Sequence, residues 1–367
     1  MANDSHAGRP RLKDVASLAG VSTATVSRVV NDRPGVSDEI RDRVADALRQ
    51  LQWEPSGLRG SRRARTVGLL VPELTNPIFP TFAQGIEQRL GLSGMTTVLC
   101  TSTPEGVSEA EHVEELLELG VAALVFIAGS HADTEADHSM FHDLAARGVP
   151  VIVVNGRAPT LTGVASVTCD DVEAGRLATA HLLSLGHRRI GLSAGGLRYV
   201  AGQRRADGWA KALSDAGLRA GAVVDAEGGG APRVPPSDAT EPPSPLCEDT
   251  YTISGGRRAG EVLLEEGVTA IVAASDLIAI GVLQAARARG LRIPEDLSVV
   301  GYDDSLLMPH VDPPLTTVRQ PVNDICRAIA RLCIAASNGE SLRTSEMAFH
   351  PELISRRSTG PAPGLVG

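Results

Sequence analysis

Apolar residues in the first fifty positions recur at the spacing of short amphipathic helices. Val15, Ala16 and Ala19 form one apolar stripe, which a glycine then interrupts. A second stripe follows Ser22, whose hydroxyl is placed to cap a helix by accepting a hydrogen bond from a free backbone N–H one turn further on. A third stripe recurs every four residues through positions 40–51. The pattern predicts three short helices, at about residues 12–18, 23–30 and 38–51.

From residue 66 onward, short continuous apolar runs alternate with helical stretches. This pattern is typical of strands buried in parallel sheets whose faces are covered by helices. Strands are expected at residues 67–71, 97–100, 122–127, 151–154, 166–168, 190–193, 270–273 and 298–301. Helices are expected at residues 79–90, 109–119, 175–185, 206–216, 256–266 and 278–289. Residues 225–249, rich in glycine and proline, are interpreted as a flexible surface insertion, and residues 358–367 as a frayed tail.

The charge is distributed unevenly along the chain. The 367 residues carry a net charge of −9, which taken alone argues against binding to nucleic acid. Residues 1–65, however, carry a net charge of +4, and the rest of the chain carries −13. The segment SGLRGSRRAR at positions 56–65 contains four arginines and is typical of a basic linker. The chain is therefore a short basic head on a large acidic body, and nucleic acid is a candidate partner of the head.

Two further features limit the compartment. No apolar run reaches the roughly 18–20 residues of a membrane span, and the polar N-terminus lacks the apolar region of a signal peptide. We therefore expect a cytoplasmic protein with no membrane contact. The five cysteines form no CxxC pair and are expected to be reduced, with Cys326 and Cys333 on one buried helical face.

The segment LKDVASLAGVSTATVSRVVN at positions 12–31 carries the strongest functional signal. Two short helices joined by a glycine-containing turn predict a helix-turn-helix, whose second helix enters the DNA major groove. The valines and alanines supply a small core. The outward side of the second helix carries small and polar residues together with Arg28, which has the reach to contact base edges or phosphates.

Six sequence blocks in the same order resemble LacI/GalR-family transcriptional regulators over some 310 residues. They are the helix-turn-helix segment, Asn76-Pro77-Ile78-Phe79, HLLSLGH at positions 181–187, DLIAIG at 276–281, Gly301-Tyr302-Asp303-Asp304, and LTTVRQ at 315–320. The resemblance implies a homodimeric repressor that reads a pseudo-palindromic operator in double-stranded DNA. Its body is expected to be similar to a periplasmic sugar-binding protein, with a small-molecule effector held between two lobes.

The expected fold is a small all-α helix-turn-helix head followed by a two-lobed α/β body with parallel sheets. The head spans residues 10–54, the hinge 55–66 and the effector-binding and dimerisation body 67–357. Within the body, one lobe is expected to comprise residues 67–160 and 290–318, and the other residues 161–289 and 319–357. The DNA-binding residues implied by the resemblance are Ser22, Thr23, Ala24, Thr25, Ser27, Arg28 and Asn31 in the head, with Leu58 and Arg59 in the hinge.

Thr23 and Ala24 match family positions that touch bases, and their short side chains offer mainly methyl contacts. The hinge is about three residues shorter than in the family, so two outcomes stay open: a hinge helix that inserts Leu58 into the minor groove, or an arginine-rich segment that contacts only phosphates.

The resemblance also implies an effector site. Phe79 matches a position that stacks on the effector, Arg205 a pocket arginine and Asp276 a ligand-binding aspartate at the end of a strand. Further candidates are Asn76, Asn155, Arg157 and Trp209. This set suits a carbohydrate, while a nucleobase or a small acid stays open. The effector, the operator, and the choice between induction and co-repression are not specified by the sequence.

Two enzyme-like patterns need a separate interpretation. Residues 191–195 spell G-x-S-x-G, the nucleophile elbow of α/β-hydrolases, but Ser193 lies inside an apolar run rather than at a strand-to-helix turn. The alternative function is therefore a solute-binding or hydrolytic α/β protein that uses Ser193 and carries a vestigial head. The polar cluster at positions 131–142 is interpreted as a loop rather than a metal site. We expect no enzyme activity, no metal and no cofactor.

Overall fold

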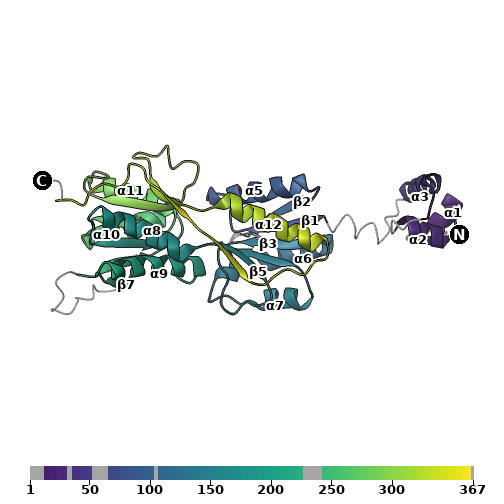
Figure 1. The fold of residues 1–367 in the computed structure, drawn as a ribbon, viewed down its shortest axis with the longest axis horizontal. Coiled ribbons are helices and arrows are strands. Elements are labelled where there is room, and N and C mark those ends of the chain that lie inside the picture. The colour runs from purple at the N-terminus through teal and green to yellow at the C-terminus, as the bar shows by residue number, and fades with distance from the viewer. Residues whose placement is uncertain (1–11, 31–34, 52–64, 103–105, 226–241, 365–367) are drawn as a thin grey trace, which may run out of the picture.

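The structure is a computed structural model that describes residues 12–30, 35–51, 65–102, 106–225 and 242–364. Within these residues the chain forms a helical head and two α/β lobes (Figure 1). The expected class, a helix-turn-helix head on a two-lobed body with parallel sheets, is confirmed.

The head consists of three helices around a small core. The helices are α1 (Leu12–Ala19), α2 (Thr23–Val30) and α3 (Asp38–Gln50). Their shared core is built from Val15, Ala16, Ala19, Val26, Val44 and Ala47. In the turn before α2, the Ser22 hydroxyl accepts a hydrogen bond from the Thr25 N–H at 3.1 Å, as the sequence predicts. The Arg43 guanidinium of α3 donates to the Ala19 carbonyl oxygen at 2.7 Å and so ties the third helix to the end of the first.

The first lobe, which we call the N-lobe, contains a six-stranded parallel sheet in the order β12-β5-β4-β3-β1-β2. Its strands are β1 (Thr66–Val71), β2 (Thr96–Thr101), β3 (Ala123–Ile127), β4 (Val151–Val154), β5 (Ala165–Cys169) and β12 (Glu346–Phe349). Its helices are α5 (Ile78–Leu92), α6 (Glu109–Leu119), α7 (Ser139–Ala146) and α12 (Val322–Ser337), with a 3₁₀ turn η1 (Ser130–Ala132). Helices α5 and α12 share a core with one face of the sheet, and α6 and α7 with the other.

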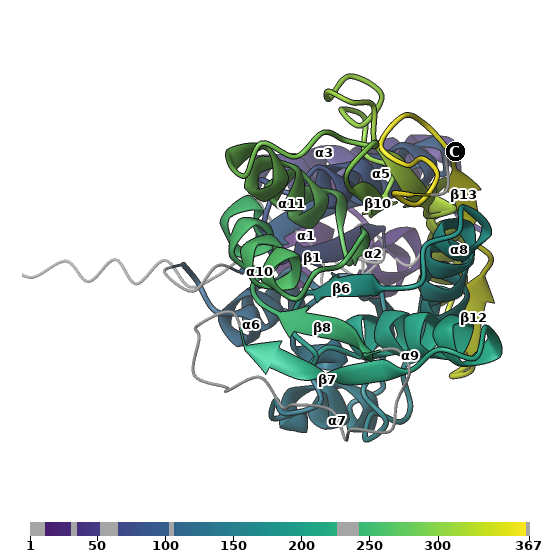
Figure 2. The same ribbon diagram turned by 90° about the vertical axis from the view of Figure 1, so that its left-hand side faces the viewer.

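The second lobe, the C-lobe, contains a seven-stranded sheet in the order β13-β11-β10-β9-β6-β8-β7. Its strands are β6 (Ile190–Ala194), β7 (Ala220–Asp225), β8 (Ser244–Glu248), β9 (Ala270–Ala273), β10 (Ser298–Asp303), β11 (Thr316–Arg319) and β13 (Glu352–Ile354). Its helices are α8 (Asp171–Ser184), α9 (Val200–Asp215), α10 (Ile253–Glu265) and α11 (Asp276–Ala288). Figure 2 shows α10 and α11 on one side of this sheet and α8 and α9 on the other.

The chain passes between the lobes three times, which we call the crossovers. They lie between β5 and α8, between β11 and α12, and between β12 and β13. Two of them are bonded to each other, because the Asp170 N–H donates to the Phe349 carbonyl oxygen at 2.8 Å. Segments that connect two lobes in this way are the usual position of a hinge.

The expected division of the body between the lobes is wrong in three places. Residues 290–318 were expected in the first lobe, but β10 pairs with β9 and therefore belongs to the C-lobe sheet. Residues 319–357 were expected in the second lobe, but within them the apolar face of α12 packs against α5, and β12 pairs with β5. Strand β5 was also expected in the second lobe, but it pairs with β4 in the N-lobe sheet. The hydrophobic pattern predicts the individual elements. Which strand each one pairs with depends instead on contacts between residues that are far apart in sequence.

Two segments expected to lack packed structure are ordered in part. Residues 244–248, inside the predicted insertion, form strand β8, which is paired on both sides by β6 and β7. The proline- and glycine-rich composition around β8 concealed it; residues 226–241 lie outside the described part of the chain. In the expected tail, the buried Ser358 hydroxyl accepts from the Thr316 N–H at 2.8 Å and donates to the Val299 carbonyl oxygen at 2.6 Å. These bonds fasten the tail to β10 and β11.

Candidate ligand pocket and nucleic-acid interface

A cavity of about 230 Å³ lies between the two lobes, at the carboxyl ends of their central strands. Its N-lobe wall is formed by Pro72, Glu73, Asn76, Ile78, Phe79, Ala128, Gly129, Ala132 and Asn155. Its C-lobe wall is formed by Tyr199, Ala201, Arg205, Tyr251, Ala274, Ser275, Tyr302, Asp303 and Gln320. Open α/β sheets bind ligands at this edge, and a wall that combines aromatic faces with a few polar groups suits a small polar organic molecule.

A buried ionic cluster forms the C-lobe side of the cavity. The Arg205 guanidinium donates to Asp171 Oδ1 at 2.6 Å and to the Tyr251 hydroxyl at 3.1 Å. It also lies 4.4 Å from the centre of the Tyr302 ring, whose hydroxyl donates to the same Asp171 oxygen at 2.9 Å. Burial raises the pKa of Asp171, while the adjacent guanidinium opposes that shift. The cluster therefore holds a guanidinium in one orientation at the cavity wall.

Two polar atoms of residues that line the cavity have no hydrogen-bond partner among the described residues. They are Arg205 Nε, a donor, and Gln320 Oε1, an acceptor. The amide nitrogen of Gln320 is engaged, because it donates to Asp303 Oδ1 at 2.7 Å. Burial, followed by the nearby Asp276 carboxylate, raises the pKa of Asp303 well above its usual range. Both atoms are almost inaccessible to solvent, so neither faces the open cavity.

Backbone strain gathers at the same place. Among the described residues, the non-glycine residues with positive φ are Ala128 (48°), Asn155 (65°), Asp303 (119°) and Asp304 (55°). The first three line the cavity, and the fourth follows directly. Such conformations cost roughly 1–3 kcal/mol each and are concentrated at ligand sites, where the surrounding structure holds them.

The structure brings four of the seven predicted effector residues to the cavity: Asn76, Phe79, Asn155 and Arg205. Arg157 does not line it; its guanidinium donates to the carbonyl oxygens of Val164 and Thr344, at 3.2 and 2.9 Å. Trp209 is 1% exposed, packs in the C-lobe core, and donates from Nε1 to the Ile190 carbonyl oxygen at 3.1 Å. Neither side chain therefore lines the cavity.

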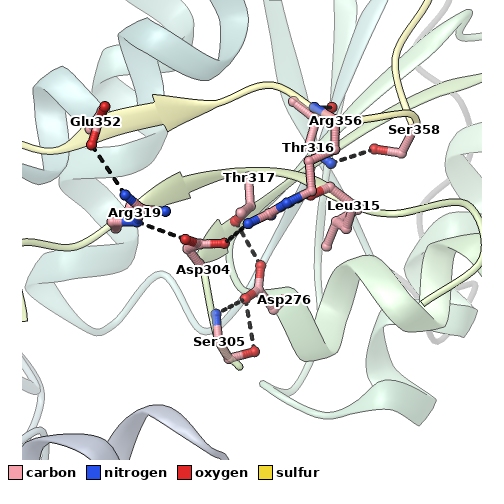
Figure 3. Close-up of polar contacts among 10 residues, drawn as sticks. All are labelled: Asp276, Asp304, Ser305, Leu315, Thr316, Thr317, Arg319, Glu352, Arg356 and Ser358. Carbon is pink, nitrogen blue, oxygen red and sulfur yellow. Dashed lines mark hydrogen bonds and ion pairs between the residues drawn. The ribbon is translucent and has the colours of Figure 1, made fainter. Parts of the chain in front are cut away.

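Asp276, the third exception, is enclosed within the C-lobe (Figure 3). Its Oδ2 accepts from the Ser305 N–H and hydroxyl at 2.7 and 3.0 Å, and its Oδ1 accepts from the Thr317 hydroxyl at 2.7 Å. Burial raises the pKa of this carboxyl to about 7. The side chain fixes the loop after β10 rather than facing the cavity. Asp303 is the aspartate at the wall. Like Asp276, it lies close to the end of a predicted strand, so that position alone does not distinguish the two.

Figure 3 also shows how the residue after Asp303 is held. The Asp304 carboxylate accepts from Arg319 Nε at 2.7 Å and from Arg356 at 2.5 Å. Other cavity residues absent from the prediction are Tyr199, Tyr251, Tyr302 and Gln320. Tyr302 and Gln320 lie within the family-like blocks, whereas nothing in the local sequence marks Tyr199 or Tyr251.

The second helix of the head presents a small polar surface. Ser22, Thr23, Ala24 and Arg28 are exposed, and Thr25 and Ser27 are half-exposed. Val26, on the opposite face, is fully buried against the other helices of the head. Short side chains at the start of α2 permit close approach of its backbone to a DNA groove, and Arg28 supplies a long donor. The predicted residues Asn31, Leu58 and Arg59 lie outside the described residues.

The enzyme-like patterns have structural roles. Ser193 is fully buried in β6, a strand inside the C-lobe sheet, and its hydroxyl has no partner among the described residues, so no base activates it. In the polar cluster, His131 Nε2 bonds the Val154 carbonyl oxygen at 2.9 Å, and burial lowers the pKa of this imidazole to about 4. His138 bonds the Thr160 hydroxyl and the Ser130 carbonyl oxygen, at 3.0 and 2.9 Å.

A helix-turn-helix head and a two-lobed body with a cavity between the lobes define the class of ligand-responsive DNA-binding transcriptional regulators. Comparison with protein families agrees. Residues 11–56 match the bacterial regulatory proteins of the lacI family, residues 64–226 the periplasmic binding proteins and sugar-binding domain of the LacI family, and residues 179–359 a periplasmic binding protein-like domain. No helix in the described part of the chain is both long and apolar enough to cross a membrane.

The chain belongs to the LacI family of transcriptional regulators. It is 46% identical over 356 residues to an uncharacterized HTH-type transcriptional regulator from Streptomyces limosus, with 95% of this chain and 94% of the relative covered. A solved complex of the transcriptional regulator CelR with cellobiose is 32% identical, with a TM-score of 0.67 and 95% and 100% of the two chains covered. The Lac repressor dimer bound to operator and the anti-inducer ONPF is 26% identical, with a TM-score of 0.70 and coverage of 96% and 100%.

Proposed function

We propose that this regulator is a homodimeric repressor whose affinity for its operator is controlled by a sugar bound between the lobes. The observation that carries the sugar assignment is the cavity wall, where aromatic rings stand beside a fixed guanidinium and several amide and carboxyl side chains. Sugars present alternating C–H faces and hydroxyl groups, which are the complements of these two kinds of group. The cellobiose complex of CelR supports this choice.

The residues proposed to contact the sugar are Asn76, Phe79, Asn155, Arg205, Asp303 and Gln320. Since this wall is divided between the lobes, a bound sugar contacts both of them and favours one relative orientation. An effector shifts an equilibrium only by the difference in its affinity for the two states. The rotation about the crossovers is proposed to alter the spacing of the two heads in the dimer and thereby the affinity for the operator.

On the DNA side, Ser22, Thr23, Ala24, Thr25, Ser27 and Arg28 are proposed to face the major groove. The operator complex of the Lac repressor dimer supports this assignment and the dimeric state. Because a regulator of this class acts where DNA is, we place its activity in the cytoplasm. The net charge of +4 on residues 1–65 attracts the phosphates, and the −13 of the remaining chain restricts contact to the head.

The test is a thermal-shift screen of the full chain against cellobiose, maltose, ribose, adenine and citrate. A sugar present at 100 times its Kd is expected to stabilise the protein by about 2.7 kcal/mol, which raises Tm by several degrees. Gln320→Leu keeps the size of the side chain but removes the amide that lines the cavity and holds Asp303, so it is expected to reduce the shift. Gln203→Leu, at an exposed position of α9, is the matched control.

The sugar assignment is refuted if adenine or citrate stabilises the protein while the sugars do not. The operator assignment has its own test. Duplexes selected from a random pool by the full chain are expected to share a two-fold symmetric sequence, and a pool that stays random refutes sequence-specific binding.

A further inference from the structure

Within the described residues, two polar ties join the lobes near the cavity wall, apart from the three crossovers. The first lies at α9's N-terminal end. Arg198, in the C-lobe, forms an ion pair of 2.7 Å with Asp133, in the N-lobe loop after η1. The Arg198 carbonyl oxygen also accepts from both the N–H and the hydroxyl of Thr134, each at 2.9 Å. An isolated antiparallel bridge between Asp133 and Tyr199 completes this tie.

The second tie lies about one turn into α9. The Arg204 guanidinium donates to both carboxylate oxygens of Glu346, the first residue of β12, at 2.9 and 3.2 Å. The two side chains are 30% and 27% exposed. A forked pair of this kind fixes the direction of approach as well as the distance. Because Glu346 belongs to the N-lobe sheet, this pair spans the two lobes.

Each tie is adjacent in sequence to the cavity wall. Arg198 precedes Tyr199, and Arg204 precedes Arg205; both following residues line the cavity. The Arg198 guanidinium also lies 5.1 Å from the centre of the Tyr199 ring. The same stretch of chain therefore contacts the cavity with one residue and the opposite lobe with its neighbour.

We propose that Arg198 and Arg204 are positioning residues that hold the lobes in this orientation and set how strongly effector binding is coupled to operator binding. Rotation about the crossovers separates Asp133 from Arg198 and Glu346 from Arg204, so opening of the lobes breaks both ties. A ligand that displaces Tyr199 or Arg205 also displaces the preceding arginine, which bonds to the N-lobe. The consequence for regulation rests on the proposed function, whereas the effect on lobe orientation does not.

The experiment measures the distance between the lobes directly. Spin labels are placed on the full chain at exposed positions Ala146 in α7 and Ser214 in α9, with the half-buried Cys100 replaced by serine. Labelled protein is diluted into an excess of unlabelled protein, so that label pairs within one protomer dominate. Double electron–electron resonance then gives the interlobe distance distribution without any added sugar.

Arg204→Gln is expected to shift molecules from the interlobe distance of this structure toward longer distances. The ratio of the first population to the second is expected to fall by up to about fivefold, the upper range for a partly exposed ion pair. The matched control is Arg176→Gln. Arg176 makes an equally forked pair with Glu173, at 2.6 Å for both bonds, with side chains 38% and 29% exposed, but both residues belong to α8. This control is expected to leave the distance distribution unchanged.

Reversal of the pair in the double variant Arg204→Glu with Glu346→Arg is expected to restore the original distribution, which a merely structural role of either residue does not predict. If Arg204→Gln folds poorly, Glu346→Gln removes the same contact from the other side. The proposal is overturned if Arg204→Gln and Glu346→Gln keep the original distribution, or if Arg176→Gln changes it equally. A sugar screen without a hit refutes the proposed function and leaves this measurement interpretable.

Discussion

Loss of the negative charge of Asp171 tests the ionic cluster at the cavity wall most directly. Asp171→Asn preserves the shape of the side chain and leaves the buried Arg205 guanidinium without its anionic partner. The two side chains of this pair are 2% and 10% exposed. Removal of one partner from a buried pair costs about 3–5 kcal/mol, because the remaining charge stays desolvated. The asparagine carbonyl still accepts from Arg205, so we expect a loss near 3 kcal/mol.

The assay is a double-mutant cycle measured by urea unfolding at one protein concentration. Arg205→Met removes the cation and fills a similar volume, and the double variant removes both charges. We expect the double variant to lose at least about 2 kcal/mol less than the sum of the two single variants. Asp215→Asn is the control, because its pair with Lys211 is 59% exposed on both sides and is worth under about 1 kcal/mol.

Two results refute this reasoning. If Asp171→Asn costs no more than Asp215→Asn, the guanidinium is solvated and does not belong to a fixed cluster. If the two single losses simply add, the residues do not interact. Sugar binding supplies a second readout, since Asp171→Asn keeps Arg205 but releases it from its orientation and is therefore expected to weaken binding.

Three further outcomes are expected. Arg28→Ala removes the long donor of α2 and is expected to weaken operator binding by about tenfold or more in fluorescence anisotropy, with an unchanged Tm; equal affinity contradicts its role. Trp209→Phe leaves a gap and an unpaired Ile190 carbonyl oxygen, so the free energy of unfolding is expected to fall by about 1–3 kcal/mol while the sugar Kd stays the same. A larger Kd would instead show that Trp209 contributes to the effector site. Asp276, with a folded-state pKa raised to about 7, binds a proton more tightly when folded, so its contribution to stability is complete below about pH 4 and is lost as pH rises to 7. Asp276→Asn is expected to flatten the dependence of Tm on pH in that window, and an unchanged slope contradicts the raised pKa.

The head and the individual elements were predictable from the sequence, because their determinants are local. The cap at Ser22 and the stripe that includes Val15 and Val26 specify α1 and α2 without information from the rest of the chain. The same holds for most strands and helices of the body, whose apolar runs coincide with the elements observed.

The division into lobes was not predictable in this way. Strand β10 has the same apolar character as a strand of either sheet, and only its pairing with β9 assigns it to the C-lobe. The same limit applies to the site. Asp276 and Asp303 both follow apolar strands, but three donors enclose the first, while the strained backbone of the second leaves it at the cavity. Tyr251 reaches Arg205 from a separate loop, which local sequence does not reveal.

The path of the chain also dictates the order in which the two lobes are completed during synthesis. Strands β1 to β5 emerge first, but the sheet they form lacks its edge strand β12, and α5 lacks the covering helix α12, until residues 322–349 have been made. All strands of the C-lobe except β13 emerge before that point. The ribosome therefore delivers a nearly complete second lobe while the first still exposes the apolar surface that its last helix will cover. A nascent chain arrested before residue 322 therefore exposes apolar surface of the kind that chaperones bind. Its head is complete, but the two-lobed body that would respond to an effector is not.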